Sequence, residues 1–555
     1  MAGIGNGPLC DGGVLASCVT DPLSGCFEVA TSTTCGSGNR CRLGACEPCP
    51  TNFCQDGQLT SGTFCTGERA YTTCGADADG CGVEVTVADC PAGAPVCAQD
   101  SSSTVACEPC PDSVCSTAGV GSGTTCDLST RVACTTNPIT QCIEQSGTLD
   151  TCTGRLGRCF AGQCTTSRIA AGRWHTCVLT GSGAVRCWGA SDQGQLGYGA
   201  TNVIGDEPTD VLTVDVQLGG PALELAAGGD NTCVLQAGGV VRCWGRNTFG
   251  NLGLGDTNNR GDAAGEMPPP PVPLGGPAVR VTVGEFHACA LMASGAVRCW
   301  GFGGDGRLGR GDEQSIGDQS SDNMLFDINV GGTVSDIFAG GYHTCALLTS
   351  GQVRCWGRGY LLGSGQTSNV GDEPNEMPPP PVLLGPSPSF VAVGTFHACA
   401  QLGNGEVRCW GDGYRGQLGF PEMSYYGDQS SEVITSSVPL GQPALTVAAG
   451  DVHSCAIMQD NTLRCWGDGA FGKLGYGNED TLGDDPTDIL DVPVPLSHPV
   501  IDVAVGFFHT CVIVSTGAAR CWGYGHAGRL GYGNTMTIGN TPMSTAANAG
   551  DVPVF

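Results

Sequence analysis

Basic charge is scarce in this 555-residue chain, because 24 lysine and arginine residues face 53 aspartate and glutamate residues and Lys473 is the only lysine. The resulting net charge of −29 argues against nucleic-acid and anionic-membrane partners, since phosphate binding needs clustered basic side chains. No apolar run is long enough to predict a membrane-spanning segment. The start, MAGIGNGPLC, lacks the charged and apolar segments of a secretory signal, so we expect a trimmed mature start or an artificial start at position 1.

Catalytic signatures are also missing. The sequence has no nucleophile elbow, no H-E-x-x-H and no phosphate-binding glycine loop followed by a helix. We therefore predict no enzymatic activity, no metal and no cofactor. The acidic loops Gly199–Asp210 and Gly477–Asp488 are the candidates for Ca²⁺ ligation, because Ca²⁺ prefers several oxygen ligands, although neither loop matches a defined calcium motif.

Cysteine, in contrast, is abundant. The chain has 36 cysteines, which predicts an oxidising compartment and an extracellular or cell-surface location. Their density falls after Cys164, which places a domain boundary near Thr165–Ser167. The predicted organisation is three cysteine-rich modules at residues 1–48, 49–108 and 109–165, followed by a repeat domain at residues 166–555.

Each cysteine-rich module has an even number of cysteines, as a closed set of disulfides requires. The first module lacks the counterparts of two cysteines found in the others, so Cys49–Cys54 and Cys110–Cys115 are candidate self-contained pairs. The remaining connectivity stays open. The Cys-Glu-Pro-Cys segments at Cys46–Cys49 and Cys107–Cys110 raise zinc binding as an alternative, but the surplus of nearby cysteines favours disulfides.

The rest of the chain repeats the tripeptide Cys-Trp-Gly seven times, at intervals of 56 residues except for one of 54. This period, with several short β-patterned segments per copy, indicates a propeller or solenoid. In one copy we expect four strands, at residues 214–219, 223–229, 231–236 and 240–245. The first copy lacks the first of these strands, and the C-terminal residues 551–555 match its pattern. We therefore predict an all-β, seven-bladed β-propeller that its N- and C-terminal strands close within the first blade.

Every copy has a second cysteine ten residues before the Cys-Trp-Gly cysteine. The two cysteines would stand opposite each other in a hairpin, with Cα atoms about 4.5–5.5 Å apart, which suits a disulfide. Pairs of buried reduced thiols are the alternative. The predicted disulfides are Cys177–Cys187, Cys233–Cys243, Cys289–Cys299, Cys345–Cys355, Cys399–Cys409, Cys455–Cys465 and Cys511–Cys521.

The segment GRWHTCVLTGSGAVRCWGASDQGQLGYG (172–199) resembles the repeat of the regulator of chromosome condensation family, and the resemblance extends over about residues 167–555. It implies a seven-bladed β-propeller closed by its termini, of a secreted bacterial type with paired cysteines. The nuclear member exchanges nucleotide on a small GTPase and docks on chromatin, and plant photoreceptor relatives use clustered tryptophans. A secreted bacterial relative inhibits a β-lactamase with its propeller face. The acidic charge and the cysteines of this chain argue against the nuclear functions, and Trp174 is its only tryptophan outside the Cys-Trp-Gly positions.

Two further residue types recur in register. Six copies have a histidine two residues before the first blade cysteine, whereas the second copy has Asn231; a structural role that satisfies buried polar groups is favoured over a metal site. These histidines are His175, His287, His343, His397, His453 and His509. An arginine precedes the second blade cysteine in every copy, at Arg186, Arg242, Arg298, Arg354, Arg408, Arg464 and Arg520. Each long loop except the last, which has Asn540, has a Gly-Asp that could pair with this arginine, although solvated, unrelated charges are an equal alternative.

These features lead to three hypotheses about function. The first is an exported, non-enzymatic protein whose disulfide-stabilised propeller serves as an interaction, adhesive or assembly module, with an unknown protein partner or self-assembly. The second is an inhibitor of an extracellular enzyme, which aromatic anchors clustered on one face would favour. The candidate anchors are Tyr198, Phe249, Tyr360, Tyr414, Phe471 and Tyr524. The third is a guanine-nucleotide exchange factor, which would need reduced cysteines and an intracellular location.

Overall fold

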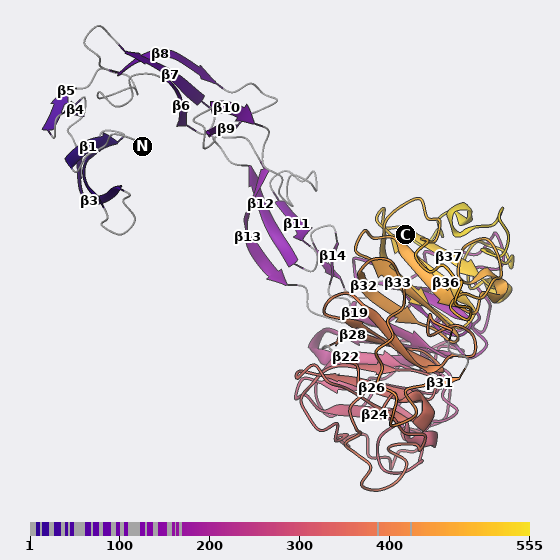
Figure 1. Ribbon diagram of the computed structural model, residues 1–555. Helices are drawn as coiled ribbons and strands as arrows, with labels where there is room; N and C mark the ends of the chain where they lie inside the picture. Colours follow the sequence, from indigo (N-terminus) through magenta and orange to yellow (C-terminus); the bar gives the residue numbers. More distant parts are fainter. Residues whose placement is uncertain are drawn as a thin grey trace. The chain divides into compact units, whose positions relative to one another are not determined.

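The computed structural model describes residues 169–385, 388–421 and 424–555, together with the backbone of the strands β1–β15 that precede residue 166 (Figure 1). The chain divides into two units. One contains Met1–Thr153 with Gly157–Cys164, and the other contains Gly154–Leu156 with Thr165–Phe555.

The first unit repeats one succession of strands three times, a three-stranded antiparallel sheet followed by a two-stranded sheet. The sheets are β1-β2-β3, β4-β5, β6-β7-β8, β9-β10, β11-β12-β13 and β14-β15. Their bounds are β1 Gly7–Asp11, β2 Val14–Thr20, β3 Phe27–Thr34, β4 Asn39–Arg42, β5 Ala45–Pro48, β6 Gly62–Gly67, β7 Ala70–Ala76, β8 Gly82–Asp89, β9 Val96–Gln99, β10 Val105–Glu108, β11 Gly123–Asp127, β12 Thr130–Thr136, β13 Ile143–Thr151, β14 Arg158–Phe160 and β15 Gln163–Thr165.

The backbone register of this unit places Cys41 opposite Cys46 and Cys97 opposite Cys107. The candidate pairs Cys49–Cys54 and Cys110–Cys115 lie outside the described residues. The module boundaries and the disulfide connectivity of residues 1–165 therefore stay predictions.

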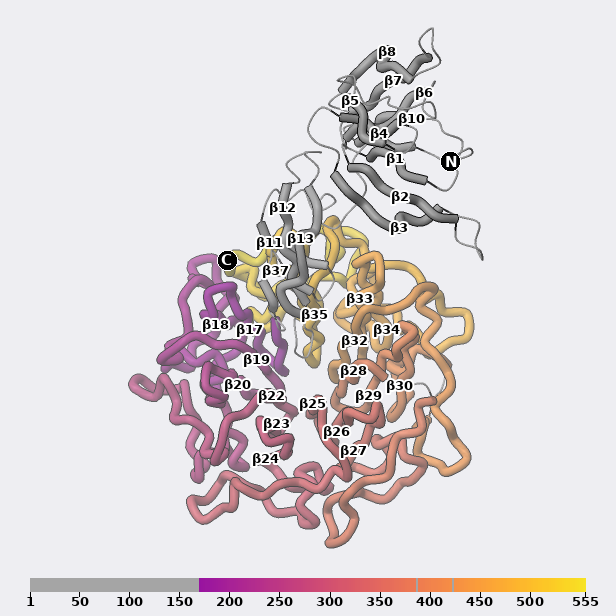
Figure 2. Tube along the Cα trace, turned by 90° about the vertical axis from the view of Figure 1, so that its left-hand side faces the viewer, coloured from indigo at the N-terminus to yellow at the C-terminus, as the bar shows by residue number. Residues whose placement is uncertain are grey.

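Seven antiparallel sheets, each built from consecutive strands, make up the second unit and surround a central axis as propeller blades (Figure 2). Their strands are β16 Ile169–Ala171, β17 His175–Leu179, β18 Val185–Gly189; β19 Ala222–Gly228, β20 Asn231–Gln236, β21 Val240–Gly245; β22 Ala278–Val283, β23 His287–Met292, β24 Val297–Gly301; β25 Val334–Ala339, β26 His343–Leu348, β27 Val353–Gly357; β28 Pro388–Val393, β29 His397–Leu402, β30 Val407–Asp412, β31 Tyr425–Tyr426; β32 Ala444–Ala449, β33 His453–Met458, β34 Leu463–Gly467; and β35 Val500–Val505, β36 His509–Val514, β37 Ala519–Gly523. Short 3-10 helices are η1 Ala237–Gly239, η2 Gly304–Gly306, η3 Gly359–Leu361, η4 Ala470–Gly472, η5 His526–Gly528 and η6 Ala546–Ala549. The predicted seven-bladed, all-β fold is confirmed.

The sequence of each strand suits its depth in the blade. Every residue of the middle strand β20, NTCVLQ, is buried, because neighbouring blades cover both faces of the sheet. The first strands line a central cavity of about 150 Å³. The tryptophans of all seven Cys-Trp-Gly tripeptides are completely buried between blades. A nearly continuous apolar middle strand is what a sheet covered on both faces requires.

The grouping of strands into blades differs from the prediction. Residues 223–229, 231–236 and 240–245 form β19, β20 and β21 as expected. The segment 214–219 does not join them, because the Val216 N–H donates to the Val185 carbonyl oxygen of β18 in the preceding blade, at 2.8 Å. Six blades are therefore three-stranded sheets and the fifth, with β31, is four-stranded; the segment that follows the third strand in sequence lies along the outer edge of the blade, as residues 214–219 do beside β18.

The chain ends meet where the ring closes, as predicted. Strand β16 of the first blade contacts β35 of the seventh, and the Gly533 N–H donates to the Gly205 carbonyl oxygen. The assignment of residues 551–555 to the first blade is wrong, since the Val552 N–H donates to the Ala519 carbonyl oxygen of β37 in the seventh blade, at 2.8 Å. This segment reaches the first blade through Arg186, whose guanidinium donates to the Val554 carbonyl oxygen at 2.7 Å.

Candidate functional site

Seven disulfides join the second and third strands of the blades, and all seven predicted blade pairs are present. The Cα atoms of each pair are 4.0–4.1 Å apart, and all fourteen cysteines are buried. Each pair occupies the narrow, non-hydrogen-bonded position of the ladder, and the bridged Cα atoms lie closer still than the ~4.5 Å usual for that position. The bridges therefore fix the register of every blade hairpin.

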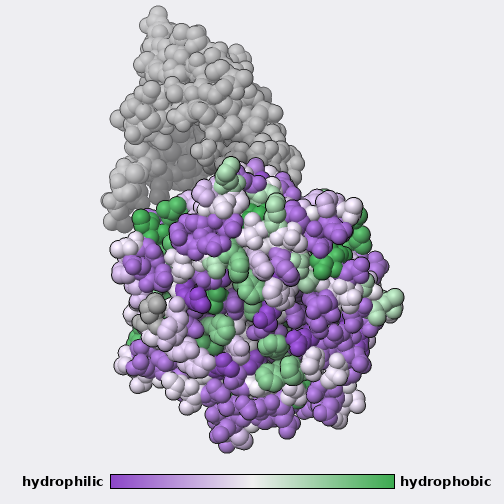
Figure 3. Space-filling view, turned by 90° about the vertical axis from the view of Figure 1, so that its right-hand side faces the viewer, coloured by the Kyte–Doolittle hydropathy of each residue, from purple (hydrophilic) through white to green (hydrophobic). Residues whose placement is uncertain are grey.

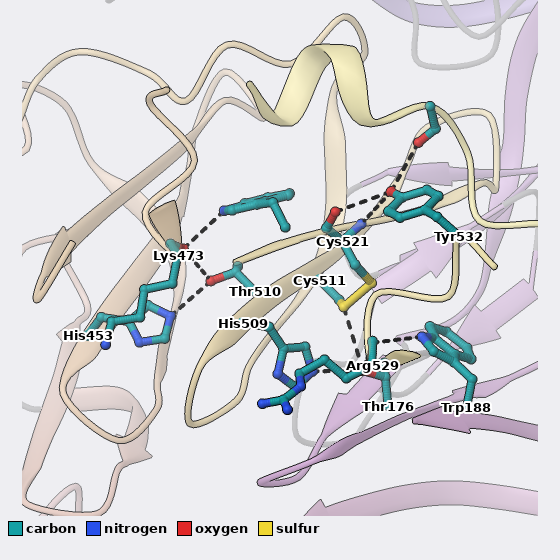
Figure 4. The surroundings of a disulfide bond; sticks show 12 residues. Thr176, Trp188, His453, Lys473, His509, Thr510, Cys511, Cys521, Arg529 and Tyr532 are labelled. Atoms are coloured by element: carbon teal, nitrogen blue, oxygen red, sulfur yellow. Dashed lines mark hydrogen bonds between the residues drawn. A yellow bond between two sulfur atoms is a disulfide. The ribbon is translucent and has the colours of Figure 1, made fainter. Parts of the chain in front are cut away.

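In three blades a tyrosine hydroxyl is hydrogen-bonded to the backbone of the second blade cysteine, on the side of the third strand that faces away from the hairpin. The Tyr198 hydroxyl accepts a hydrogen bond from the Cys187 N–H at 2.9 Å and donates to the Cys187 carbonyl oxygen at 3.1 Å. Figure 4 shows Tyr532 in the same relation to Cys521. Burial raises the pKa of Tyr198 to about 12. Tyr198 is thus part of the blade framework, and its role as an anchor for a partner stays a prediction.

The recurrent histidines link neighbouring blades. His509 Nε2 lies 2.8 Å from Thr176 Oγ1, which also donates to the Arg529 carbonyl oxygen (Figure 4). Trp188 Nε1 donates to that same carbonyl at 2.8 Å. The equivalent pairs are His175–Thr232, His287–Thr344, His397–Ser454 and His453–Thr510, with distances of 2.6–2.9 Å. These contacts support a structural role, and among the described residues no three His, Cys, Asp or Glu side chains gather as a metal site.

Two blade junctions depart from this pattern. Asn231 stands in place of the histidine where the next blade presents Ala288, which has no hydroxyl. His343 is retained although the next blade presents Ala398, so its Nε2, which the other recurrent histidines place against a hydroxyl, lacks a hydrogen-bond partner. Trp410 Nε1 lacks one as well. This second junction coincides with the one shortened repeat interval, between Cys355 of the fourth blade and Cys409 of the fifth.

The recurrent arginines connect the edge segments of adjacent blades. Arg186 Nε donates to Asp215, and Arg298 and Arg520 bind Asp327 and Asp551 in the same way, each at 2.7 Å. These carboxylates belong to the edge segments, not to the Gly-Asp dipeptides. The predicted pairing of the recurrent arginines with the Gly-Asp carboxylates is therefore wrong for these three blades.

The long acidic loops fold around a carboxylate. Asp210 Oδ2 accepts hydrogen bonds from the backbone N–H groups of Gly205, Asp206 and Glu207 at 2.7–3.1 Å. Glu266, Asp322, Glu376, Glu432 and Asp488 repeat this arrangement. Converging N–H groups attract anions, so the carboxylates are already used within the loops. Within the described residues, no three acidic side chains of the loops Gly199–Asp210 and Gly477–Asp488 come together as a calcium site would require.

One face of the ring forms where two sets of loops meet around the mouth of the central cavity. In each blade the loop between the first two strands is hydrogen-bonded to the segment after the third strand, as between the Ala190 N–H and the Trp174 carbonyl oxygen, at 2.9 Å. Backbone glycines of the first set line the mouth. We call this surface the channel-mouth face and define it by residues 171–175, 190–195, 228–231, 246–251, 284–287, 302–307, 340–343, 358–361, 394–397, 412–417, 450–453, 468–473, 506–509 and 524–529.

Partly or fully exposed aromatic side chains concentrate on the channel-mouth face. They are Trp174, Phe249, Phe286, Phe302, Tyr342, Tyr360, Phe396, Tyr414, Phe471, Phe507, Phe508 and Tyr524. The rings of Trp174 and Phe508 lie 4.9 Å apart, and those of Phe471 and Tyr524 lie 4.5 Å apart. Hydrophobic and hydrophilic side chains alternate over the side of the disc shown in Figure 3.

The face includes five of the six aromatic anchors expected from sequence, all except Tyr198. Trp174, Phe286, Tyr342, Phe396 and Phe508 had not been recognised. Each precedes the recurrent histidine, so the signal was an aromatic residue before histidine in most copies. The sequence alone could not show that these residues lie beside the loops that follow the third strands.

Charged groups are interleaved with the rings. The Arg358 guanidinium lies 3.9 Å from the Tyr342 ring centre and forms an ion pair with Asp305. Arg173 reaches Glu285 at 3.1 Å, from the first blade to the third. Burial raises the pKa of Glu285, although the nearby Arg173 opposes this shift. Aromatic and arginine side chains are the residues that contribute most to protein–protein binding.

Comparisons with known proteins agree with this architecture. A family model described as RCC1-like domain matches residues 141–489, and one described as regulator of chromosome condensation (RCC1) repeat matches residues 500–529. The chain is 29% identical to the ultraviolet-B receptor UVR8 of Arabidopsis thaliana over 375 residues, which cover 66% of this chain and 79% of the receptor. It is 33% identical to the human probable E3 ubiquitin-protein ligase HERC4 over 207 residues, which cover 36% of this chain but 18% of the ligase. The crystal structure of human WBSCR16 is similar in fold, with a TM-score of 0.50 and 20% identity, over 63% of this chain and 88% of that protein.

Proposed function

Because the chain belongs to the RCC1 family, whose propeller is a protein-interaction module, we propose that it is a secreted or cell-surface protein without enzymatic activity that binds another protein through its channel-mouth face. The observation that carries this proposal is the concentration of exposed aromatic and arginine side chains on that face. The partner could be a different protein or, in an adhesive or assembly role, a second copy of the chain.

The seven buried disulfides support the proposed location. Cytosolic thiols are kept reduced, whereas exported proteins retain such bridges. The ligase activity in the name of one relative is not carried over, since the match covers 18% of that ligase. Within the residues that the structure describes, no helix is both long and apolar enough to cross a bilayer.

Site-specific photocrosslinking tests the proposed face. A photoreactive amino acid replaces Tyr414, which is exposed on the channel-mouth face, and in a control it replaces Val433, which is exposed elsewhere. We expect a protein from the producer's exterior to crosslink to position 414 and not to position 433. Crosslinks confined to position 433, or none at position 414, would contradict the proposal.

Mass spectrometry of alkylated, unreduced protein from its source tests the location, because a free thiol in every blade would exclude an oxidising compartment.

A second candidate function is inhibition of an extracellular enzyme. The clustering of Phe249, Tyr360, Tyr414, Phe471 and Tyr524 on one face favours it, because a small number of desolvated aromatic anchors gives tight binding. An inhibitor would crosslink at position 414 to one enzyme and abolish its turnover, whereas an assembly module would crosslink without affecting turnover.

A further inference from the structure

Arg529 is a buried cation without an acidic partner. Its side chain has an exposed fraction of 0%, and its Nη1 makes no hydrogen bond. The same repeat position holds Arg307 in the third blade and Lys473 in the sixth, and each of these pairs with a carboxylate, Asp305 or Asp468. Among the ion pairs of the described residues, none includes Arg529. A buried charge without a counter-ion is unfavourable, so Arg529 differs energetically from Arg307 and Lys473, which have one.

The surroundings of Arg529 belong to the channel-mouth face. Its guanidinium lies 4.1 Å from the Trp174 ring, 5.0 Å from the Tyr524 ring and 5.8 Å from the Phe508 ring. Its Nε donates to the His526 carbonyl oxygen at 2.8 Å. Burial lowers the pKa of Arg529 to about 9, so the group is still charged at neutral pH. The rings attract this charge without neutralising it.

The third blade shows how a carboxylate reaches such a cation. Asp305 lies two residues before Arg307 and has a φ of 60°; its side chain is 22% exposed, yet it contacts the 1% exposed Arg307 at 2.6 Å. The equivalent residue of the seventh blade is Ala527, with a φ of 56°. The backbone is the same, but the side chain is a methyl group. No carboxylate of the described residues takes the place of Asp305 here, and the exposed His526, whose Nδ1 lies 3.5 Å from Arg529 Nη2, is the side chain that an acid from another molecule would displace to reach the buried guanidinium.

We propose that the partner protein inserts an aspartate or glutamate side chain over Ala527, so that its carboxylate pairs with Arg529 and its methylene groups pack against Trp174, Phe508 and Tyr524. This inference rests on the proposed function, since it specifies the chemistry of the partner at the channel-mouth face. A desolvated ion pair framed by aromatic rings is typical of the residues that dominate a protein interface.

Trp174 provides the reporter for a direct test. It is partly exposed, whereas the other seven tryptophans are completely buried. The full chain is titrated with a hexaglutamate peptide while tryptophan emission is followed, with hexaserine as the uncharged control and Trp174→Phe to identify the signal. We expect a saturable change with hexaglutamate alone. No response to hexaglutamate, or an equal response to inorganic phosphate at matched ionic strength, would overturn the proposal.

The variant Ala527→Asp supplies the missing carboxylate within the chain, as Asp305 does in the third blade. We expect it to raise the melting temperature and to weaken hexaglutamate binding about tenfold or more. Met543→Asp, which adds the same charge at an exposed residue outside the pocket, is the matched control and should leave binding unchanged. Arg529→Gln, which removes the positive charge, should weaken binding at least as much. Unchanged binding by Ala527→Asp would refute the role of Arg529.

The two proposals can fail separately. A protein that crosslinks at position 414 and binds Ala527→Asp as well as the unmodified chain would leave the proposed function intact and contradict the acidic anchor. The absence of any crosslink at position 414 would contradict the proposed function, while the peptide titration would still decide whether Arg529 accepts a carboxylate.

Discussion

Single polar residues, more than any catalytic group, distinguish the interior of this propeller. Histidine, hydroxyl and tryptophan side chains meet at one backbone carbonyl between successive blades, as at the Arg529 carbonyl oxygen. Burial without a charged partner forces these histidines to be neutral and lowers the pKa of His397 to about 3. The junctions are therefore stable near neutral pH and sensitive to acid.

The substitution His397→Asn should make stability less dependent on pH. The folded-state pKa of His397 is about 3, below the value of about 6.5 in an unfolded chain, so its contribution is complete above pH 6.5 and is lost as the pH falls towards 3. Each such histidine costs about 1.4 kcal/mol of unfolding free energy per pH unit in this window. Denaturant unfolding between pH 7 and pH 5 should show a shallower slope for the variant. Equal slopes for the variant and the unmodified protein would disprove the argument.

Ala398→Ser should stabilise the junction between the fourth and fifth blades. A serine here would place a hydroxyl near the unpartnered His343 ring, in the position that Ser454 occupies beside His397 at 2.6 Å. One such hydrogen bond contributes about 1 kcal/mol. Chemical denaturation should report this gain, whereas Ala288→Ser, opposite Asn231, should gain less. A loss of stability at position 398 would mean that the space left by the alanine cannot accept the hydroxyl.

Whole elements were predictable where the sequence pattern is local. The hairpins β20–β21 and their equivalents follow from apolar runs, glycine turns and cysteines ten residues apart, so their strands and disulfides could be derived directly. The pairing of residues 214–219 could not, because the pattern of an edge segment does not say which neighbour it joins. The channel-mouth face was only partly predictable, since Trp174 and Tyr524 are far apart in sequence and meet only when the ring closes.

Removing one blade disulfide should cost stability mainly through the unfolded chain. The bridge Cys345–Cys355 spans ten residues, and closing a loop of this length stabilises the fold by about 3 kcal/mol. Cys345→Ala/Cys355→Ala should therefore lower the free energy of unfolding by about this amount, as measured by denaturant titration. Because the bridges are buried, the native protein should also resist mild reductant. Rapid reduction of all seven bridges under native conditions would contradict their burial.

The ring as a whole is held by contacts between residues at the two ends of the chain. The Ile169 N–H donates to the Asp502 carboxylate at 3.2 Å, and Val552 and Val554 are buried against both the seventh and first blades. Closure removes the exposed sheet edges that an open arrangement would leave. It also brings Trp174 of the first blade beside Phe508 and Arg529 of the seventh, so the proposed pocket exists only in the closed ring.

Deleting residues 551–555 should open this junction before any other. The truncation removes two buried valines, each of which contributes roughly 1.5–3 kcal/mol of burial, and the carbonyl that Arg186 binds. Hydrogen exchange should then accelerate in β16 and β37 while β25 and β26 keep their protection. Trp174 emission should shift as the pocket loses its seventh-blade wall. Deleting Phe555 alone, which is 48% exposed, should change neither measurement. If exchange rises equally in all blades, the ring unfolds as a single unit and the terminal segment is not a separate closing element.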